Sequence, residues 1–217
     1  MEKFKVAIII PSKNEEKTIF DVVKRAKKIG TPIVIDDNSN DKTEEIKFDK
    51  NIIYIRNKIN LGYEKSIQIG FEAAERNKYK YLITLDADGQ HDTNDISKII
   101  NLLNKGNYLV IGERAQLQRV SEYFFSFFYS LFYNIRDPLS GLKGYNIELF
   151  KVNNNIFDNN TLIGTDLLIT CIKKKYKLAK FSINTYPRKD KPRYGNIFKS
   201  NFKIFRALLL NILYLLK

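Results

Sequence analysis

The chain has 217 residues, which suffice for one sizeable domain but not for two complete ones. Hydrophobic residues make up 44% and aromatic residues 13%, so a buried core is expected and wholesale disorder is excluded. One cysteine and one histidine exclude a disulfide framework and Cys- or His-rich metal sites. Thirty-seven Lys and Arg against 24 Asp and Glu leave a net charge of +13, which predicts polyanionic surroundings such as nucleic acid, phosphorylated substrates or an anionic membrane face.

Neither a secretory signal nor a full transmembrane span is expected from the apolar segments. The first apolar run covers only residues 6–10 and stops at Pro11 without a cleavage-like site. No stretch approaches the roughly 20 apolar residues that cross a bilayer. We therefore expect a protein of a reducing compartment.

The first half of the chain alternates between strand and helix signals. Short apolar, β-branched runs predict strands at residues 4–10, 33–35, 52–55, 81–85 and 108–111. Apolar residues at helical spacing predict helices between them, at 15–29, 63–76 and 92–103. Such repeated strand–helix–strand units indicate an α/β fold with a mostly parallel central sheet covered by helices.

The second half is less regular. Its predicted elements are, in chain order, an aromatic helix at about 119–134, a loop at 137–141, a helix at 165–175 with Cys171 packed inside, a strand-like run at 176–186, a basic loop at 188–195 and an apolar C-terminal helix. No internal repeat or low-complexity linker interrupts them.

Acidic residues follow two of the predicted strands. Asp36 and Asp37 follow the second strand, and Asp86 and Asp88 follow the fourth. Ligands of open α/β sheets bind beyond the carboxyl ends of the strands. Residues two apart in an extended chain point the same way, so Asp86 and Asp88 can present both carboxylates to one point. Together with the carbonyl of Gln90 they suit Mg²⁺ or Mn²⁺, with phosphate oxygens and water in the remaining positions.

Four segments of the chain occur in a recognisable order: Pro11-Ser12-Lys13-Asn14-Glu15, Asp36-Asp37-Asn38-Ser39-Asn40-Asp41-Lys42-Thr43, Asn60-Leu61-Gly62 and Asp86-Ala87-Asp88-Gly89-Gln90-His91. In this order they resemble the inverting GT-A family 2 glycosyltransferases. Later segments resemble one branch, the polyprenyl-phosphate (dolichol-phosphate) mannosyl- and glucosyltransferases. These segments are Gly112-Glu113-Arg114, Arg119-Val120-Ser121, Asp137-Pro138-Leu139-Ser140-Gly141, Gly164-Thr165-Asp166 and Arg193-Tyr194-Gly195. The similarity covers about residues 4–200.

The resemblance implies a GT-A, Rossmann-like fold that binds a nucleotide-sugar donor. Pro11, Glu15, Asp36 and Asp37 would line the nucleoside pocket. Lys13 departs from the family, which often has an aromatic residue there. Alternatively, Pro11 only stops a strand and Glu15 only favours the start of a helix.

The resemblance also assigns the metal. Asp86, Asp88 and Gln90 would hold Mg²⁺ or Mn²⁺ on the donor diphosphate. Through this cation Asp86 would also bind the donor, and Asp88 would take part in catalysis. A divalent cation stabilises the charge that develops on a nucleoside diphosphate leaving group. His91 is expected to support or cap this segment rather than to act in catalysis.

The acceptor decides which residues are needed on the other side of the site. An ionised phosphate is already a nucleophile, whereas a sugar hydroxyl needs a general base. Arg114, Arg119 and Ser121 stand where the branch binds lipid phosphate, and Arg119 is also a candidate catalytic residue. Alternatively, Arg114 and Arg119 are solvated arginines on the surface. Asp166 matches the position where many family 2 enzymes carry their base, and both acceptor types stay open. Further candidates for contacts with the diphosphate or the acceptor are Lys143, Arg188 and Arg193.

Two segments suggest contact with a membrane. Eight of the eleven residues 123–133 are Phe or Tyr, which fits an interfacial helix, with core packing or a dimer seam as the alternative. The C-terminal tail is apolar nearly all round and must be buried in lipid or in a partner. We expect a catalytic domain at 1–195, which includes the aromatic helix, and a membrane-associating or partner-binding helix at 196–217.

The leading hypothesis is a metal-dependent, inverting glycosyltransferase. It would transfer a sugar from a nucleotide sugar to a polyprenyl phosphate, peripherally on the cytoplasmic side of an anionic membrane. The C-terminal helix would form the contact within a homo-oligomer or with a small membrane partner. The first alternative is a family 2 enzyme of cell-surface glycan synthesis with a sugar hydroxyl as acceptor. From other classes come a non-catalytic membrane-surface protein and a nucleic-acid-binding protein; we expect no nucleic acid, because no basic stripe with base-stacking aromatics is evident.

Overall fold

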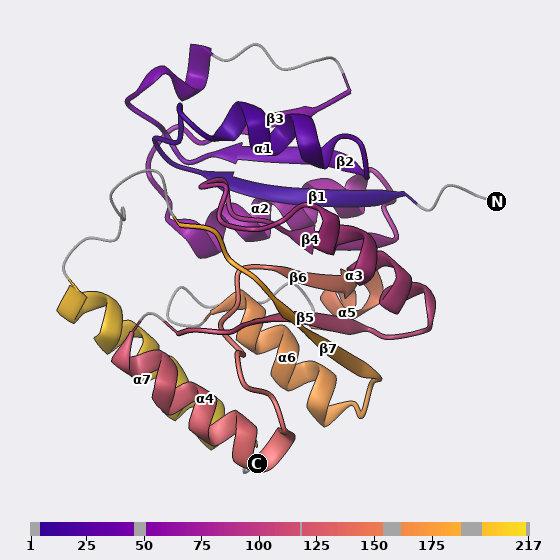
Figure 1. Cartoon of the computed structure of the whole chain (residues 1–217), viewed down its shortest axis with the longest axis vertical. Helices are drawn as coiled ribbons and strands as arrows, with labels where there is room; N and C mark the ends of the chain where they lie inside the picture. Colours follow the sequence, from indigo (N-terminus) through magenta and orange to yellow (C-terminus); the bar gives the residue numbers. More distant parts are fainter. Residues whose placement is uncertain (1–4, 46–50, 118, 154–161, 188–196, 216–217) are drawn as a thin grey trace.

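The computed structural model describes residues 5–45, 51–117, 119–153, 162–187 and 197–215 (Figure 1). Within these ranges one sheet has seven strands in the order β3-β2-β1-β4-β6-β5-β7. The strands are β1 (Val6–Ser12), β2 (Thr31–Asp36), β3 (Ile53–Arg56), β4 (Tyr81–Thr84), β5 (Leu109–Arg114), β6 (Lys143–Asn146) and β7 (Leu178–Ile183). The helices are α1 (Ile19–Ala26), α2 (Tyr63–Arg76), α3 (Asn94–Asn104), α4 (Val120–Tyr133), α5 (Ile147–Val152), α6 (Ile163–Lys173) and α7 (Ile197–Leu215).

The sheet is mixed and mostly parallel, which confirms the predicted α/β fold. Strands β1 to β4 run parallel to one another, as do β5 and β7, and β6 alone among the described strands runs antiparallel. The carboxyl ends of β1, β2, β3 and β4 therefore meet at one edge of the sheet. Thr84 at the end of β4 pairs with Lys143 at the start of β6, so Lys143 lies at the same edge.

Strand β6 is missing from the sequence-based prediction, which treated 137–141 as a loop and predicted no strand between this loop and the helix at 165–175. The strand contains a lysine and a glycine and lacks any β-branched residue, so it carries no local strand signal. It is held from both sides by β4 and β5. Gly144 is required there, because a Cβ would come within 3.2 Å of the Leu103 side chain and closer still to Ile99 of α3.

Helices cover both faces of the sheet (Figure 1). On β1, Ala7 and Ile9 pack into a core with α2, α5 and α6, whereas Ile8 and Ile10 pack into a second core with α1 and α3. This alternation is expected for a strand buried on both faces. Cys171 lies in the first core and is fully buried, as predicted.

Helices α4 and α7 pack side by side at the lower left of Figure 1. The Ser121 hydroxyl donates to Oδ1 of Asn201 at 2.6 Å, and Nδ2 of Asn211 donates to the Tyr129 hydroxyl at 3.2 Å. Within α4, Tyr129 is fully buried while Phe127 is exposed. The aromatic block is thus divided between core and surface, because one helix face cannot bury every ring. None of the helices described here is long and apolar enough to cross a membrane.

Candidate active site

The loop after β2 is organised by Asp36. The buried Asp36 carboxylate accepts hydrogen bonds from the Ser39 N–H at 2.9 Å and from the Tyr54 hydroxyl at 2.8 Å. Burial, and then the Asp36 carboxylate, raise the pKa of Tyr54. Nε of Arg56 lies 3.8 Å from Asp36, and the same guanidinium donates to the Ser39 carbonyl at 3.1 Å. Asp36 therefore ties β2 to β3. Its carboxylate is satisfied by these hydrogen bonds and by the ion pair with Arg56.

Asp37 organises the next loop. Its carboxylate accepts from Nδ2 of Asn57 at 2.9 Å and from the backbone N–H groups of Leu61 and Gly62 at 2.7 and 2.8 Å. Gly62 begins α2 with a φ of 88°, which favours glycine. An ionised carboxylate has about four acceptor positions, so the three bonds leave little capacity for a base or ribose. Asp37 therefore holds the loop that leads into α2.

Pro11 and Glu15 lie where β1 leaves the sheet. Pro11 is buried in register with Ile35 of β2. The Glu15 carbonyl accepts from the Thr18 and Ile19 N–H groups at 3.0 and 2.9 Å, so a turn precedes α1 and the helix begins later than predicted. These contacts agree with the alternative interpretation, in which Pro11 stops a strand and Glu15 precedes the start of a helix.

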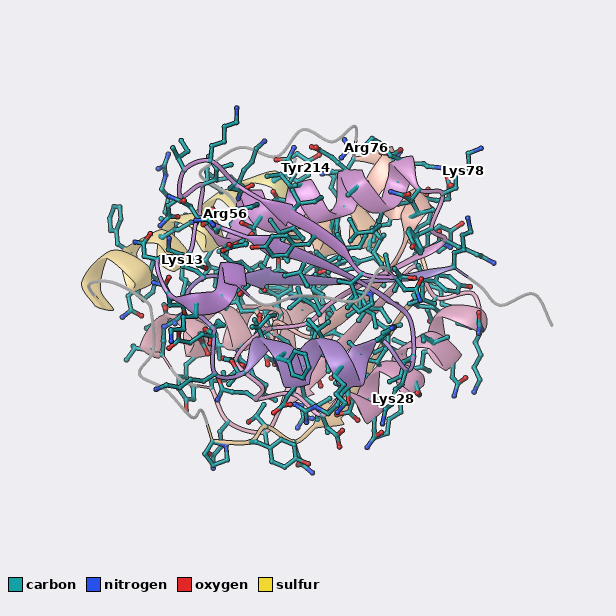
Figure 2. All side chains as sticks on the ribbon, turned by 90° about the horizontal axis from the view of Figure 1, so that it is seen from above. Lys13, Lys28, Arg56, Arg76, Lys78 and Tyr214 are labelled. Atoms are coloured by element: carbon teal, nitrogen blue, oxygen red, sulfur yellow. The ribbon has the colours of Figure 1, made fainter. Side chains whose placement is uncertain are left out.

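Two cations flank these acidic loops. Nζ of Lys13 donates to the Asn38 carbonyl. Figure 2 shows Lys13 and Arg56 at the same end of the molecule, opposite Lys78, which follows the C-terminal end of α2. Lys13 and Arg56 each contact a backbone carbonyl of the loop after β2, so positive charge lies beside this loop.

The Asp86 carboxylate is partly exposed and held by two neighbours. The Tyr63 hydroxyl donates to its Oδ1 at 3.0 Å, and Nε2 of His91 lies 3.3 Å from its Oδ2. Burial would raise the pKa of Asp86, but the contacts with His91 and Tyr63 and the charge of Arg114 outweigh it, so the pKa lies below its usual value. Asp86 is thus ionised and oriented, as a metal ligand must be.

Asp88 and Gln90 are less available. Oδ1 of the largely buried Asp88 accepts from the Gln90 N–H at 3.1 Å. The Gln90 carbonyl, a predicted metal ligand, accepts from the Tyr186 N–H at 2.8 Å, and the Gln90 amide donates to the Tyr186 carbonyl at 3.1 Å. An adjacent bridge between His91 and Thr185 continues this pairing. Gln90 therefore holds the segment after β7 against the acidic loop.

The acidic loop fits a divalent cation only in part. In the described ranges, no three His, Cys, Asp or Glu side chains converge on a point that could hold a metal ion. Asp86 and Asp88 supply hard oxygens, and Mg²⁺ or Mn²⁺ commonly completes such a set with phosphate oxygens and water. The residues fit a cation that is shared with a bound diphosphate.

A cavity of about 80 Å³ lies beside Asp86, between α2, β4, β6 and α6. Glu64 lines it and accepts from the Ile163 N–H, the first of α6, at 2.8 Å. Burial raises the pKa of Glu64, whereas the Ile163 N–H and then Lys203 and Lys143 act in the opposite direction. The sequence prediction missed Glu64; its place two residues after the Asn60-Leu61-Gly62 segment was the available signal.

Lys143 forms another wall of this cavity. It is buried, and its Nζ donates to the Ser140 carbonyl at 2.7 Å. Burial lowers the pKa of Lys143 to about 8, against the opposing charges of Asp137, Glu64 and Asp86. The lysine was predicted to contact a diphosphate or acceptor; the structure places it at the sheet edge, where it lines the cavity.

Arg114 is largely buried and pairs with two carboxylates. Its guanidinium makes a bidentate pair with Asp137 at 2.7 and 3.0 Å and reaches Glu122 at 3.2 Å. Burial opposes the charge, yet Asp137 and then Glu122 hold the pKa of Arg114 above its usual value. Two carboxylates already balance this cation, and its role at a lipid phosphate stays a prediction.

The remaining acceptor candidates are distributed differently from the prediction. Ser121 is fully buried and bonded to Asn201, so a phosphate has no access to its hydroxyl. Arg119 is one-fifth exposed at the N-terminus of α4, 3.6 Å from Glu122. Asp166 is partly exposed in the first turn of α6, close enough to raise the pKa of Glu64. The last two candidates, Arg188 and Arg193, lie outside the described residues.

Residues 7–155 match the sequence profile of Glycosyl transferase family 2. The chain belongs to this family. It is a nucleotide-sugar-dependent glycosyltransferase with a GT-A fold, as the resemblance implied.

The glycosyltransferase is similar to proteins of archaea along most of its length. MJ1222 of Methanocaldococcus jannaschii, an uncharacterized protein, is 29% identical over 97% of this chain and 93% of its own. The UDP-N-acetylglucosamine–dolichyl-phosphate N-acetylglucosaminyltransferase of Methanococcus voltae is 27% identical over 94% of this chain and 95% of its own.

A solved structure supports the fold. Glucosyl-3-phosphoglycerate synthase from Mycobacterium tuberculosis, in complex with Mn²⁺, UDP and phosphoglyceric acid, superposes with a TM-score of 0.74. The match covers 95% of the glycosyltransferase and 78% of the synthase at 16% sequence identity. At that identity the likeness concerns the GT-A architecture alone.

Proposed function

We propose that this family 2 glycosyltransferase transfers a sugar from a nucleotide donor to a polyprenyl phosphate at an anionic membrane surface. The observation that carries the proposal is the exposed apolar face of α4 and α7, with Arg119 at its start beside the sheet edge. The similarity to a dolichyl-phosphate N-acetylglucosaminyltransferase supports it.

Asp86 and Asp88 would hold Mg²⁺ or Mn²⁺ on the donor diphosphate. The cation would offset the charge that develops on the leaving group. The protein's own part is to orient Asp86, through Tyr63 and His91, and to keep it ionised. Lys13 and Arg56 at the same end of the molecule would balance the remaining phosphate charge.

The acceptor side rests on Arg119. An ionised phosphate needs cations rather than a base, and Arg114 and Ser121 are committed to other contacts. Arg119 lies at the N-terminus of α4, where the helix dipole and backbone N–H groups also favour an anion. Its ion pair with Glu122 would loosen as a phosphate approaches.

The membrane side rests on the surface that α4 and α7 share, here called the α4–α7 face. Its exposed apolar residues are Val120, Tyr123, Phe124, Phe127, Leu131 and Phe132 of α4, and Phe202, Phe205, Leu209, Leu213 and Tyr214 of α7. Lys203 and Arg206 are exposed on the same helix α7. Each cation near an anionic leaflet contributes about 1 kcal/mol. Exposed apolar residues on two packed helices, with cations on one of them, suit peripheral attachment.

A sugar hydroxyl is the second candidate acceptor. The observation in its favour is Asp166, in the first turn of α6, whose first residues line the cavity beside Asp86. In that case Asp166 would act as the general base. Asp166→Asn should then abolish turnover, whereas transfer to a phosphate should leave partial activity.

The direct test is transfer to a lipid. The purified protein would receive uridine diphosphate sugars, Mn²⁺ and a short polyprenyl phosphate, with the matching polyprenol as a control acceptor. The proposal expects a lipid-linked sugar with the phosphate and none with the polyprenol. Product on the polyprenol, or on a free sugar but not on the phosphate, would overturn it.

A further inference from the structure

The cavity beside Asp86 is not lined by Asp86 or Asp88, but two of the residues that line it lie against the Asp86 carboxylate. Tyr63 lines the cavity and donates to Asp86, and Gly141 lines it while lying against the Asp86 carboxylate. A diphosphate bound at Asp86 would therefore carry its sugar to the cavity mouth. One water needs about 10–15 Å³ of such space, so about 80 Å³ admits a substituent of a few atoms rather than a whole nucleotide.

The cavity presents an acceptor and a donor to such a substituent. Oε2 of Glu64 takes the Ile163 N–H, and its other carboxylate oxygen is bonded to none of the residues that the structure describes. The Lys143 ammonium has three donors, of which one goes to the Ser140 carbonyl. A Cβ on Gly164 would lie 3.2 Å from Nζ of Lys143 and 3.4 Å from the Tyr145 hydroxyl, so both polar groups face the start of α6.

We propose that this cavity receives the acetamido group of an N-acetylhexosamine donor, with Glu64 accepting from the amide N–H and Lys143 donating to the amide carbonyl. The inference rests on the donor half of the proposed function. An acetamido group carries one donor, one acceptor and a methyl group. The cavity offers one acidic wall, one basic wall and the apolar side chains of Ile67, Leu139 and Leu162.

A hydroxyl matches these walls less well. It can donate to one charged group and accept from the other, but both hydrogen bonds then involve a single oxygen atom. It also leaves the apolar side chains of the cavity without contact. The methyl group of an acetamido substituent covers these side chains, which favours the acetamido group over a hydroxyl.

The test compares sugars on the same nucleotide. Calorimetry with Mn²⁺ would measure binding of UDP, UDP-glucose and UDP-N-acetylglucosamine to the full chain. The parent protein should bind the N-acetylated donor at least tenfold more tightly than UDP-glucose. In Glu64→Gln, the amide oxygen can keep the Ile163 N–H while the amide NH₂ faces the ligand's N–H. That preference should fall to within about twofold, with UDP affinity unchanged.

Glu72→Gln is the matched control, because it makes the same substitution on α2 at a residue that is bonded to Gln68 and lies outside the cavity lining. It should leave the preference unchanged. Lys143→Met should reduce the preference as Glu64→Gln does. Equal affinity of the parent for both sugars, or a preference that survives Glu64→Gln, would overturn this inference alone. No binding of UDP to the parent would contradict the donor half of the proposed function as well.

Discussion

Gly141 lies directly against the carboxylate of Asp86. A Cβ at position 141 would come 2.8 Å from Cγ of Asp86, a separation that side chains do not tolerate. Tyr63 and His91 hold the other sides of the same carboxylate. A larger residue at position 141 would therefore displace the Asp86 carboxylate or separate the loop before β6 from the acidic loop after β4.

Gly141→Ala should consequently displace Asp86 and weaken cation-dependent binding of the donor. We expect at least a tenfold higher dissociation constant for UDP with Mn²⁺, measured by calorimetry, and a smaller effect without the metal. Asp86→Asn should give a similar loss, and the double variant should lose little more, because both changes disable one ligand. Unchanged Mn²⁺-dependent binding in Gly141→Ala would show that Asp86 is not a ligand.

Asp88→Ala tests the second carboxylate. It should remove Mn²⁺-dependent nucleotide binding and leave the unfolding transition nearly in place, because Asp88 lies in the loop after β4 and outside the strands of the sheet. Asp92→Ala is the control in the same segment, where the carboxylate accepts the Asn94 N–H at 2.9 Å. If both variants bind the nucleotide with Mn²⁺ as the parent does, the metal is held elsewhere.

The parallel strands and their acidic ends were predictable because their signals are local. Apolar runs mark β1, β2 and β4, and Asp86 and Asp88 follow one of them at a spacing of two. Strand β6 was not predictable, since its few residues become a strand only between β4 and β5.

The roles of several site residues depend on partners far away in the chain. Ser121 bonds to Asn201 across 80 positions, and Glu64 bonds to Ile163 across 99. The resemblance to the polyprenyl-phosphate branch assigned Ser121 to a phosphate and gave no role to Glu64. Which side chains a buried polar group meets is decided by packing, and no single segment contains that information.

Ser121→Ala separates the two interpretations of the start of α4. If Ser121 joins α4 to α7, the substitution should lower the free energy of unfolding by about 1 kcal/mol and leave the Michaelis constant for the lipid phosphate unchanged. Arg119→Ala should do the opposite, raising that constant severalfold with donor binding intact. Denaturant unfolding and steady-state kinetics on both variants measure these effects. An acceptor defect in Ser121→Ala at unchanged stability would restore the serine to the phosphate site.

Lys143 predicts a stability that rises with alkaline pH. Its pKa is about 8 in the folded chain, whereas an unperturbed lysine, as in the unfolded chain, has a pKa of 10.5. Between these pH values the unfolded chain therefore binds more protons than the folded chain. Stability contributed by this residue therefore increases as pH rises from 8 to 10.5, by about 2 kcal/mol between pH 7 and pH 9.5.

Lys143→Met removes this titration and supplies the reference. The difference in the free energy of unfolding between parent and Lys143→Met should shift in favour of the parent by that amount between the two pH values. Denaturant unfolding of both proteins at each pH gives the difference, in which the other titrating groups cancel. A difference that stays constant would mean that Lys143 titrates as an exposed lysine does.

The α4–α7 face predicts a defect confined to lipid attachment. Phe127, Leu131 and Leu209 are 71%, 64% and 63% exposed, so replacing all three with serine removes apolar surface without opening the core. Phe20→Ser is the control: this residue is 52% exposed on α1, which covers the opposite face of the sheet. Because apolar area drives insertion at the interface, the triple variant should float with anionic liposomes several-fold less than the parent. Phe20→Ser should float normally, and both should keep the parent's melting transition and donor binding. Gel filtration distinguishes the other use of the face: if the triple variant floats like the parent but changes from dimer to monomer, α4 and α7 bind a second copy of the chain instead of lipid.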